Sequence, residues 1–138
     1  MKITLIGLND TEVNILPDLG SALSKKISGV EISERFAPVS EDLPIIALDS
    51  AAESEFIIVY APIDDDEEAD FIKKKLVDVE LSTKTRILKI VDEEFGIRKT
   101  ADYAFESEKE KVVEKIADRA VNILFNERAF TPKKKDFE

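Results

Sequence analysis

The sequence contains no cysteine, no histidine and no tryptophan among its 138 residues. Without cysteine the chain can form neither disulfides nor thiolate metal sites, and a cytoplasmic location is the default expectation. Without histidine it lacks the most common general base and the most common transition-metal ligand of proteins. We therefore expect no metal site and no cofactor.

Glycine is also scarce, with four in the whole chain. Neither a G-x-G-x-x-G turn nor a Walker loop occurs, which disfavours nucleotide binding through those devices. No apolar stretch is long enough to span a bilayer, and "MKITLIGLND" becomes polar too early for a signal peptide. The net charge of −10 would repel the phosphates of nucleic acids and anionic membranes. We therefore predict no nucleic-acid partner and no membrane partner.

What the chain does have is an alternation of apolar strands and amphipathic helices. The most continuous apolar run, "FIIVYAPI", is typical of a central strand covered on both faces. The strongest helical stripe is predicted over 108–125, and the segment 92–106 is predicted to be a polar connection. The patterns predict strands over 2–8, 30–37, 56–63 and 85–91, and helices over 16–27, from Leu43–Pro44 onward, over 67–83 and over 108–125.

This alternation predicts an α/β fold with three layers, α/β/α, around a four-stranded parallel sheet of the flavodoxin-like order 2-1-3-4. We expect a single domain over residues 1–126 and a loosely held tail over 127–138. The residues of the helix over 67–83 that we expect to face the sheet are Phe71, Leu76, Val79 and, as an alternative, Ile72.

In sheets of this kind, ligands bind outside the carboxyl ends of the strands, where the strand order reverses. Three predicted loops lie there: Asn9-Asp10-Thr11, the segment 38–42 and the segment 62–65. We therefore predict that Asp10, Ser40 and Asp64 meet at one rim, and that a small-molecule site would use these three loops.

The acidic run "DDDEEAD" (64–70) stands between a strand and a helix, and three interpretations of it are open. Carboxylates stabilise the start of a helix, by about 0.3–1 kcal/mol each, because its free N–H groups carry partial positive charge. A Mg²⁺ or Ca²⁺ site is the second interpretation, but the run lacks the spacing and the turn glycine of a calcium loop. A catalytic carboxylate is the third. We favour the helix start.

The order of segments resembles the lumazine synthase superfamily, and most closely its archaeal riboflavin synthase branch. The resemblance rests on "NDT" after the first strand and "APVSEDLPIIAL" after the second, and on "FIIVYAP", "LSTKTRILKIV" and a last helix that ends in "LF". The second segment is similar to the family pattern V-P-G-I-x-D-L-P, with Pro38, Asp42, Leu43 and Pro44 in place.

The resemblance implies a protein of riboflavin biosynthesis that transfers a four-carbon unit between two lumazines. The site would lie at a subunit interface of a homo-oligomer, expected to be a pentamer. Asp70 stands where the family has a histidine, so it is the implied catalytic residue. The implied substrate-binding residues are Asn9, Asp10, Thr11, Val39, Ser40, Asp42, Pro62 and Asp64.

The departures from the family pattern fall at its ligand site. Val13 and Ile15 replace an aromatic residue and an arginine, Val39 replaces a glycine, and "PIDDDEE" replaces a glycine-bearing loop. Like charges about 4 Å apart repel by about 4 kcal/mol at an effective dielectric constant of about 20, before screening. The acids would thus oppose the phosphorylated substrate of lumazine synthase. We therefore expect a divergent riboflavin synthase-like protein acting on or binding lumazine or flavin ligands, which need no phosphate.

Two alternatives stay open. An inactive paralogue could bind a flavin, a pterin or a lumazine without turnover, or the chain could serve only as an oligomeric assembly protein. For assembly, Phe95, Ile97, Tyr103 and Phe105 are candidates to face neighbouring subunits, although they could equally cover the sheet edge within one monomer.

Overall fold

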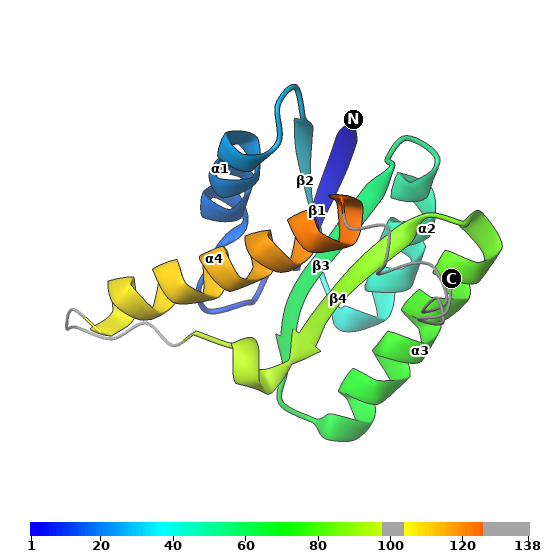
Figure 1. The fold of residues 1–138 in the computed structure, drawn as a ribbon. Helices are drawn as coiled ribbons and strands as arrows, with labels where there is room; N and C mark the ends of the chain where they lie inside the picture. Colours follow the sequence, from blue (N-terminus) through cyan, green and yellow to red (C-terminus); the bar gives the residue numbers. More distant parts are fainter. Residues whose placement is uncertain (98–103, 126–138) are drawn as a thin grey trace, which may run out of the picture.

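The computed structural model describes residues 1–97 and 104–125. Within them, four strands form one sheet in which every pairing is parallel and the order is β2-β1-β3-β4 (Figure 1). The predicted α/β class, the parallel sheet and its strand order are therefore confirmed. The strands are β1 (Lys2–Leu8), β2 (Glu31–Ala37), β3 (Phe56–Ile63) and β4 (Arg86–Asp92).

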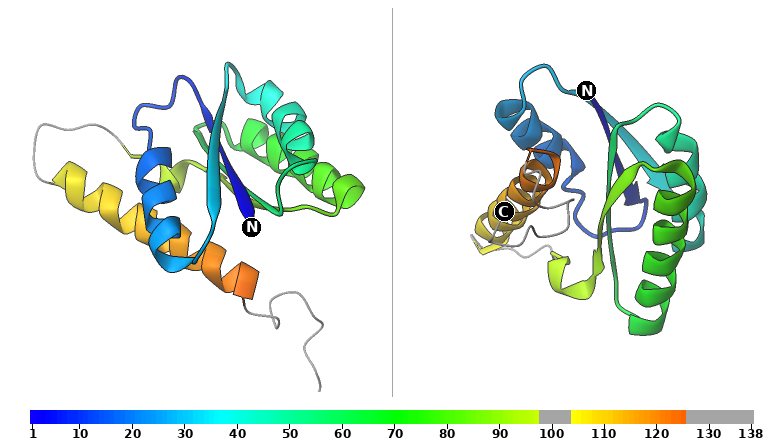
Figure 2. Two further views of the ribbon diagram at one scale, coloured as in Figure 1. Left: turned by 90° about the horizontal axis from the view of Figure 1, so that it is seen from above. Right: turned by 45° about the vertical axis from the view of Figure 1, so that its right-hand side comes forward.

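Helices cover both faces of this sheet, as a three-layer fold requires. α1 and α4 pack together on one face, and α2 and α3 pack together on the other (Figure 2). The predicted tail lies outside the described residues. The helices are α1 (Leu16–Lys26), α2 (Leu43–Ala51), α3 (Asp66–Thr83) and α4 (Ala104–Phe125), with the short 3₁₀ helices η1 (Ser40–Asp42) and η2 (Glu93–Phe95).

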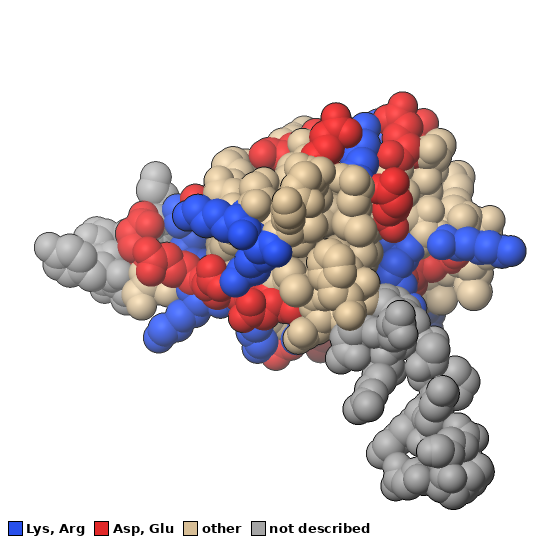
Figure 3. Space-filling model, turned by 45° about the horizontal axis from the view of Figure 1, so that its top comes forward, with Lys and Arg blue, Asp and Glu red and all other residues tan. Residues whose placement is uncertain are grey.

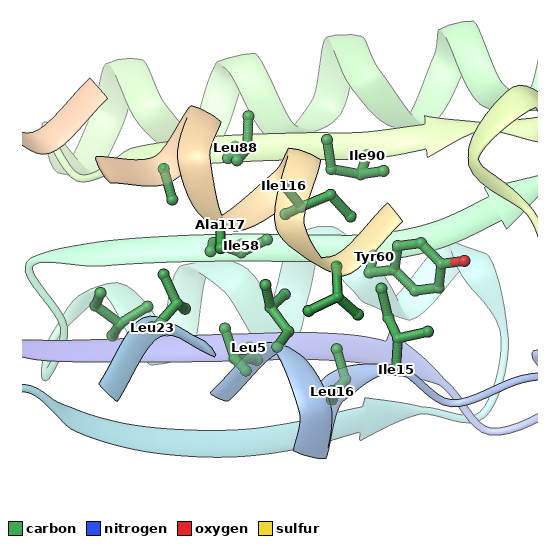
Figure 4. Close-up of a cluster of buried hydrophobic side chains, with 14 of the residues drawn as sticks. Leu5, Ile15, Leu16, Leu23, Ile58, Tyr60, Leu88, Ile90, Ile116 and Ala117 are labelled. Carbon is green, nitrogen blue, oxygen red and sulfur yellow. The ribbon is translucent and has the colours of Figure 1, made fainter. Parts of the chain in front are cut away.

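The larger apolar core lies between the sheet and the helices α1 and α4 (Figure 4). Leu5, Ile58 and Ile90, from three neighbouring strands, pack there with Leu23 of α1 and Ile116 of α4. Each side chain of this size contributes about 1.5–3 kcal/mol when it is fully buried. This core therefore fixes the strands, and hence their carboxyl ends, relative to one another.

The second core lies between the sheet and the helices α2 and α3. Ile57 and Val59 of β3 pack there with Leu43 of α2 and Leu76 of α3. β3 thus contributes to both cores, and all but one of its residues are buried. This is the pattern that the continuous apolar run predicted for a central strand.

The prediction that Phe71 faces the sheet was wrong. Its side chain is 53% exposed, whereas the neighbouring Ile72 is buried in the second core. Successive residues of a helix point about 100° apart, so the two cannot both face inward. The buried stripe of α3 continues through Leu76 and Val79, and the ammonium group of Lys75 lies 5.4 Å from the centre of the exposed Phe71 ring.

Charged side chains of both signs lie beside one another on the surface, as Figure 3 shows for one face. Ion pairs join α1 to α4: Lys26 lies 3.1 Å from Glu114 and 3.2 Å from Asp118, and Lys109 lies 3.2 Å from Asp18. Solvent screens exposed pairs of this kind, so they contribute little and the cores dominate stability. Across the described residues, no helix combines the length and the apolar character that crossing a membrane would need.

Candidate functional site

A pocket of about 770 Å³ opens at the edge of the sheet where the carboxyl ends of the strands meet. In Figure 1 this is the lower edge, toward which the arrowheads of β3 and β4 point. The loops after β1, β2 and β3 and the segment after β4 supply its walls. The pocket therefore lies where ligands bind in parallel α/β sheets.

The fold brings the three predicted strand-end loops together. Asp10 after β1, Ser40 after β2 and Asp64 after β3 all line the pocket. This follows from the parallel pairing of adjacent strands, which puts their ends at one edge. The prediction of a common rim is therefore confirmed. The predicted site residues that line the pocket are Asp10, Thr11, Val39, Ser40, Pro62 and Asp64.

The other predicted site residues, Asn9, Asp42 and Asp70, do not line the pocket. The backbone N–H of Asn9 donates a 3.0 Å hydrogen bond to the carbonyl oxygen of Ala37, so it ties the end of β1 to the end of β2. Asp42 is the last residue of η1 and directly precedes α2. Asp70 is exposed on α3. A catalytic role for Asp70 stays a prediction without support from its position.

The acidic run begins α3, as the favoured interpretation predicted. The carboxylate of Asp65 accepts hydrogen bonds from the backbone N–H groups of Glu67, at 2.9 Å, and Glu68, at 3.4 Å. A helix start leaves these donors free, and a cap of this kind stabilises by about 1 kcal/mol. Asp64, Asp65 and Glu68 also line the pocket. The run is therefore both a helix start and a pocket wall.

Carboxylates dominate the polar part of the pocket wall. Among the described residues, neither a lysine nor an arginine lines it. In the described part of the chain, no three or more carboxylates lie close enough together to bind a metal ion. The pocket therefore carries a negative field, which its low-dielectric walls focus. The seven acidic lining residues are Asp10, Glu12, Glu41, Asp64, Asp65, Glu68 and Glu93.

Two hydroxyl side chains, Thr11 and Ser40, stand among these acids. The hydroxyl of Thr11 is buried and has no hydrogen-bond partner in the described part of the chain. A buried polar group without a partner costs about 1–3 kcal/mol. The apolar lining residues are Leu8, Val39, Pro62, Ile63 and Ile97.

The segment after β4 forms the fourth wall, and Tyr60 of β3 holds it in place. The phenol of Tyr60 donates a 2.7 Å hydrogen bond to the carbonyl oxygen of Phe95. Burial, with a smaller effect of the charge on Glu108, raises the pKa of Tyr60 to about 12. The Phe95 ring is also buried, with the charged groups of Lys115 and Arg119 at 5.2 and 5.5 Å from its centre.

Gly96 allows this wall to approach the end of β3. A Cβ atom at this position would lie 3.0 Å from the carbonyl oxygen of Glu93 and 3.3 Å from Cβ of Pro62. Both Glu93 and Pro62 line the pocket. A side chain at Gly96 would therefore push two walls of the pocket apart.

Sequence reasoning missed this fourth wall, because the segment 92–106 was predicted to be only a polar connection. Glu93, Gly96 and Ile97 from this segment line the pocket. A signal was available: the fourth strand of a parallel sheet must end at the same edge as the other three.

Two of the residues considered for subunit contacts belong to the monomer's own core. Phe95 and Ile97 are buried between the sheet and the helices α1 and α4. They therefore cover the sheet within one chain. The side chains of Tyr103 and Phe105 lie outside the described residues.

Val13 and Ile15 are the residues that the predicted resemblance aligns with an aromatic residue and an arginine. Their side chains are 7% and 0% exposed and belong to the larger core. Neither lines the pocket, and no described lining residue is aromatic. A flat ligand would therefore contact aliphatic side chains such as Val39 and Pro62.

The sequence matches no protein-family model and no curated protein. Among solved structures, the fold is similar to that of a phosphate-loop protein determined in solution, with a TM-score of 0.43 and 10% sequence identity. The likeness covers 85% of this chain and 93% of the other. These comparisons do not test the resemblance to riboflavin synthases, which stays a prediction.

Proposed function

We propose that the chain binds an uncharged metabolite of the lumazine or flavin type in the strand-end pocket, as a divergent relative of riboflavin synthase that does not turn its ligand over. The observation that supports this most is the pocket itself, with about 770 Å³ at the predicted edge of the sheet. Sites for small molecules have volumes of about 300–1,000 Å³ and combine apolar walls with a few polar groups. This pocket lies within that range of volumes and combines five apolar lining residues with a larger set of polar ones.

The charge of the wall favours a ligand without phosphate. Carboxylates from all four wall segments, for example Asp10, Glu41, Asp64 and Glu93, surround the space. Each would repel a phosphate group, by about 4 kcal/mol at 4 Å and an effective dielectric constant of about 20, and less once salt screens it. Several such repulsions outweigh the gain from a few hydrogen bonds of about 1 kcal/mol each.

The same carboxylates suit a ligand that donates several hydrogen bonds, since ionised carboxylates only accept them. A ribityl lumazine or riboflavin carries a chain of hydroxyls beside a flat ring. The hydroxyls would donate to acids such as Asp64 and Glu68, and the ring would lie against Val39 and Ile97.

Binding without turnover is proposed because the residue implied for proton transfer, Asp70, is exposed outside the pocket. The chain also has no histidine that could replace it. Incubation with the ribityl lumazine should therefore give riboflavin fluorescence at the uncatalysed rate only. A catalysed rate would contradict this part of the proposal and support the riboflavin synthase-like activity that the resemblance implies.

A titration of riboflavin followed by calorimetry tests the binding, with a variant that fills the pocket. Ser40→Trp places a large side chain in the wall and should weaken binding at least about tenfold, which is about 1.4 kcal/mol. Ser24→Trp makes the same change on the exposed face of α1, away from the pocket, and should bind like the wild type. Equal binding by both variants would place the ligand elsewhere.

A further inference from the structure

Side chains cover the β4 edge of the sheet at Ile87. Glu80 of α3 accepts a 2.7 Å hydrogen bond from the backbone N–H of Ile87. Lys89 pairs with Glu80 at 2.5 Å and donates a 2.9 Å hydrogen bond to the carbonyl oxygen of Ile87. Both backbone polar groups of Ile87 are therefore occupied, which blocks the addition of another strand at this point.

The β2 edge is open by comparison. Within residues 1–97 and 104–125, β2 pairs with β1 alone, and it is the outermost strand on its side of the sheet (Figure 2). Glu31, Glu34 and Phe36 are exposed along it. An uncovered edge strand presents a row of backbone donors and acceptors, which is a template for pairing with another strand.

The side chains of β2 alternate between the two faces of the sheet. On the α1 face, Ile32 approaches Gly20, and Phe36 approaches Gly7. On the α2 face, the guanidinium of Arg35 lies 2.7 Å from the carboxylate of Asp49. Glu31 and Ser33 share the face of Arg35, because residues two apart in a strand point the same way.

One antiparallel register of β2 with its own copy places opposite charges across from each other. When Ser33 lies opposite Ser33 of a second copy, Ile32 lies opposite Glu34, and two further pairs form: Glu31 opposite Arg35 and Val30 opposite Phe36, each pair occurring twice. Opposite residues then share a face, as antiparallel pairing requires, and these two pairs combine opposite charges and apolar surfaces. Registers centred on Glu34 or on Arg35 would instead place like charges directly opposite each other, and the register centred on Ile32 would place Glu31 opposite Ser33 and so form no charge pair.

We propose that β2 pairs antiparallel with β2 of a second copy, in the register centred on Ser33. The result is a two-fold symmetric dimer in which two four-stranded sheets join into one. No residue of β2 lines the strand-end pocket, so the dimer does not depend on the proposed ligand.

Light scattering of the full chain tests the proposal through charge reversal. The wild type should be a dimer. Glu31→Arg places a second positive charge opposite Arg35 and should weaken the dimer at least about tenfold, and Arg35→Glu should do the same by pairing two negative charges. An equimolar mixture of the two variants should dimerise again, because each chain then meets opposite charges at both pairs. Asp78→Arg, on the exposed side of α3, is the matched control and should leave the dimer intact.

A melting temperature for each variant shows whether it folds. If Arg35→Glu does not fold, because it loses the contact with Asp49, then Glu31→Arg and the weakening of the wild-type dimer by salt still test the charge pairs. A monomeric wild type would overturn the proposal. So would a dimer or a pentamer that Glu31→Arg leaves unchanged.

Discussion

At the scale of single residues, Tyr60 links the core of the protein to the wall of its pocket. Its ring packs in the larger core (Figure 4). Its hydroxyl donates a hydrogen bond to the carbonyl oxygen of Phe95, within the segment that forms the fourth wall. The same burial that fixes the ring disfavours the charged phenolate and raises the pKa of Tyr60 to about 12. The stability of the fold is therefore tied to the protonation of this hydroxyl.

This link predicts a loss of stability at high pH. The pKa of Tyr60 rises from 10.0 to about 12 on folding, so its contribution is complete below pH 10 and is lost as the pH approaches 12. A shift of this size corresponds to about 2–3 kcal/mol, which denaturant unfolding at several pH values can measure.

Tyr60→Phe separates this effect from other alkaline changes. At neutral pH the variant should lose about 1 kcal/mol, because the hydrogen bond to Phe95 is gone. Between pH 10 and about 12 it should lose less stability than the wild type. If the stability of the two proteins fell in parallel as the pH rises, folding would not raise the pKa of Tyr60.

At the scale of the element, α3 combines a structural role with a place at the site. The acids at its start cap the helix, and Asp64 before it and Glu68 within it line the pocket. The sequence alone predicted the capping role, because free N–H groups at a helix start favour carboxylates wherever the helix lies. Which acids face the pocket depends on how α3 packs, and this the sequence left open.

The capping role predicts the effect of removing one carboxylate. Asp65→Ala should destabilise the protein by about 1 kcal/mol, because the N–H groups of Glu67 and Glu68 lose their acceptor. Asp78→Ala, at an exposed position later in the same helix, should change stability by less than about 0.5 kcal/mol. Denaturant unfolding of the three proteins checks this, and equal losses in both variants would contradict the capping role of Asp65.

Two segments show what the sequence patterns could not predict. In α3, Phe71 and Ile72 are both apolar, and periodicity could not decide between them until the second core fixed the rotation of the helix. After β4, the polar composition of 92–106 gave no sign of the fourth wall of the pocket. This wall is held by contacts between residues far apart in the sequence, such as that of Tyr60 with Phe95. Local composition carries no record of such contacts.

At the scale of the whole molecule, the sequence predicted the topology of the sheet, but it predicted only some of the residues that the topology brings to the pocket. Alternating strands and helices indicated a parallel sheet, and a parallel sheet brings Asp10, Ser40 and Asp64 to one edge. The sequence could not show that Asp70 turns away from that edge, since this depends on the orientation of α3. Together, the carboxylates from all the loops at this edge make the pocket negatively charged, which no single loop of the sequence indicates.

From the negative charge of the pocket, we predict that the protein binds uncharged ligands more tightly than negatively charged ones. Riboflavin and its phosphate ester share the ring and the hydroxyl chain and differ in the phosphate, which the acids of the pocket should repel. The double variant Asp64→Asn with Glu68→Gln replaces two of these acids by amides. It should reduce the difference in affinity between riboflavin and its phosphate ester. Asp78→Asn, on α3 outside the pocket, should not change it.

The most direct measurement is a calorimetric titration of the wild-type protein with riboflavin and with riboflavin phosphate at one ionic strength. Riboflavin should bind at least about tenfold more tightly than its phosphate ester, a difference of about 1.4 kcal/mol. Equal or tighter binding of the phosphate ester, or no binding of riboflavin at all, would contradict this prediction.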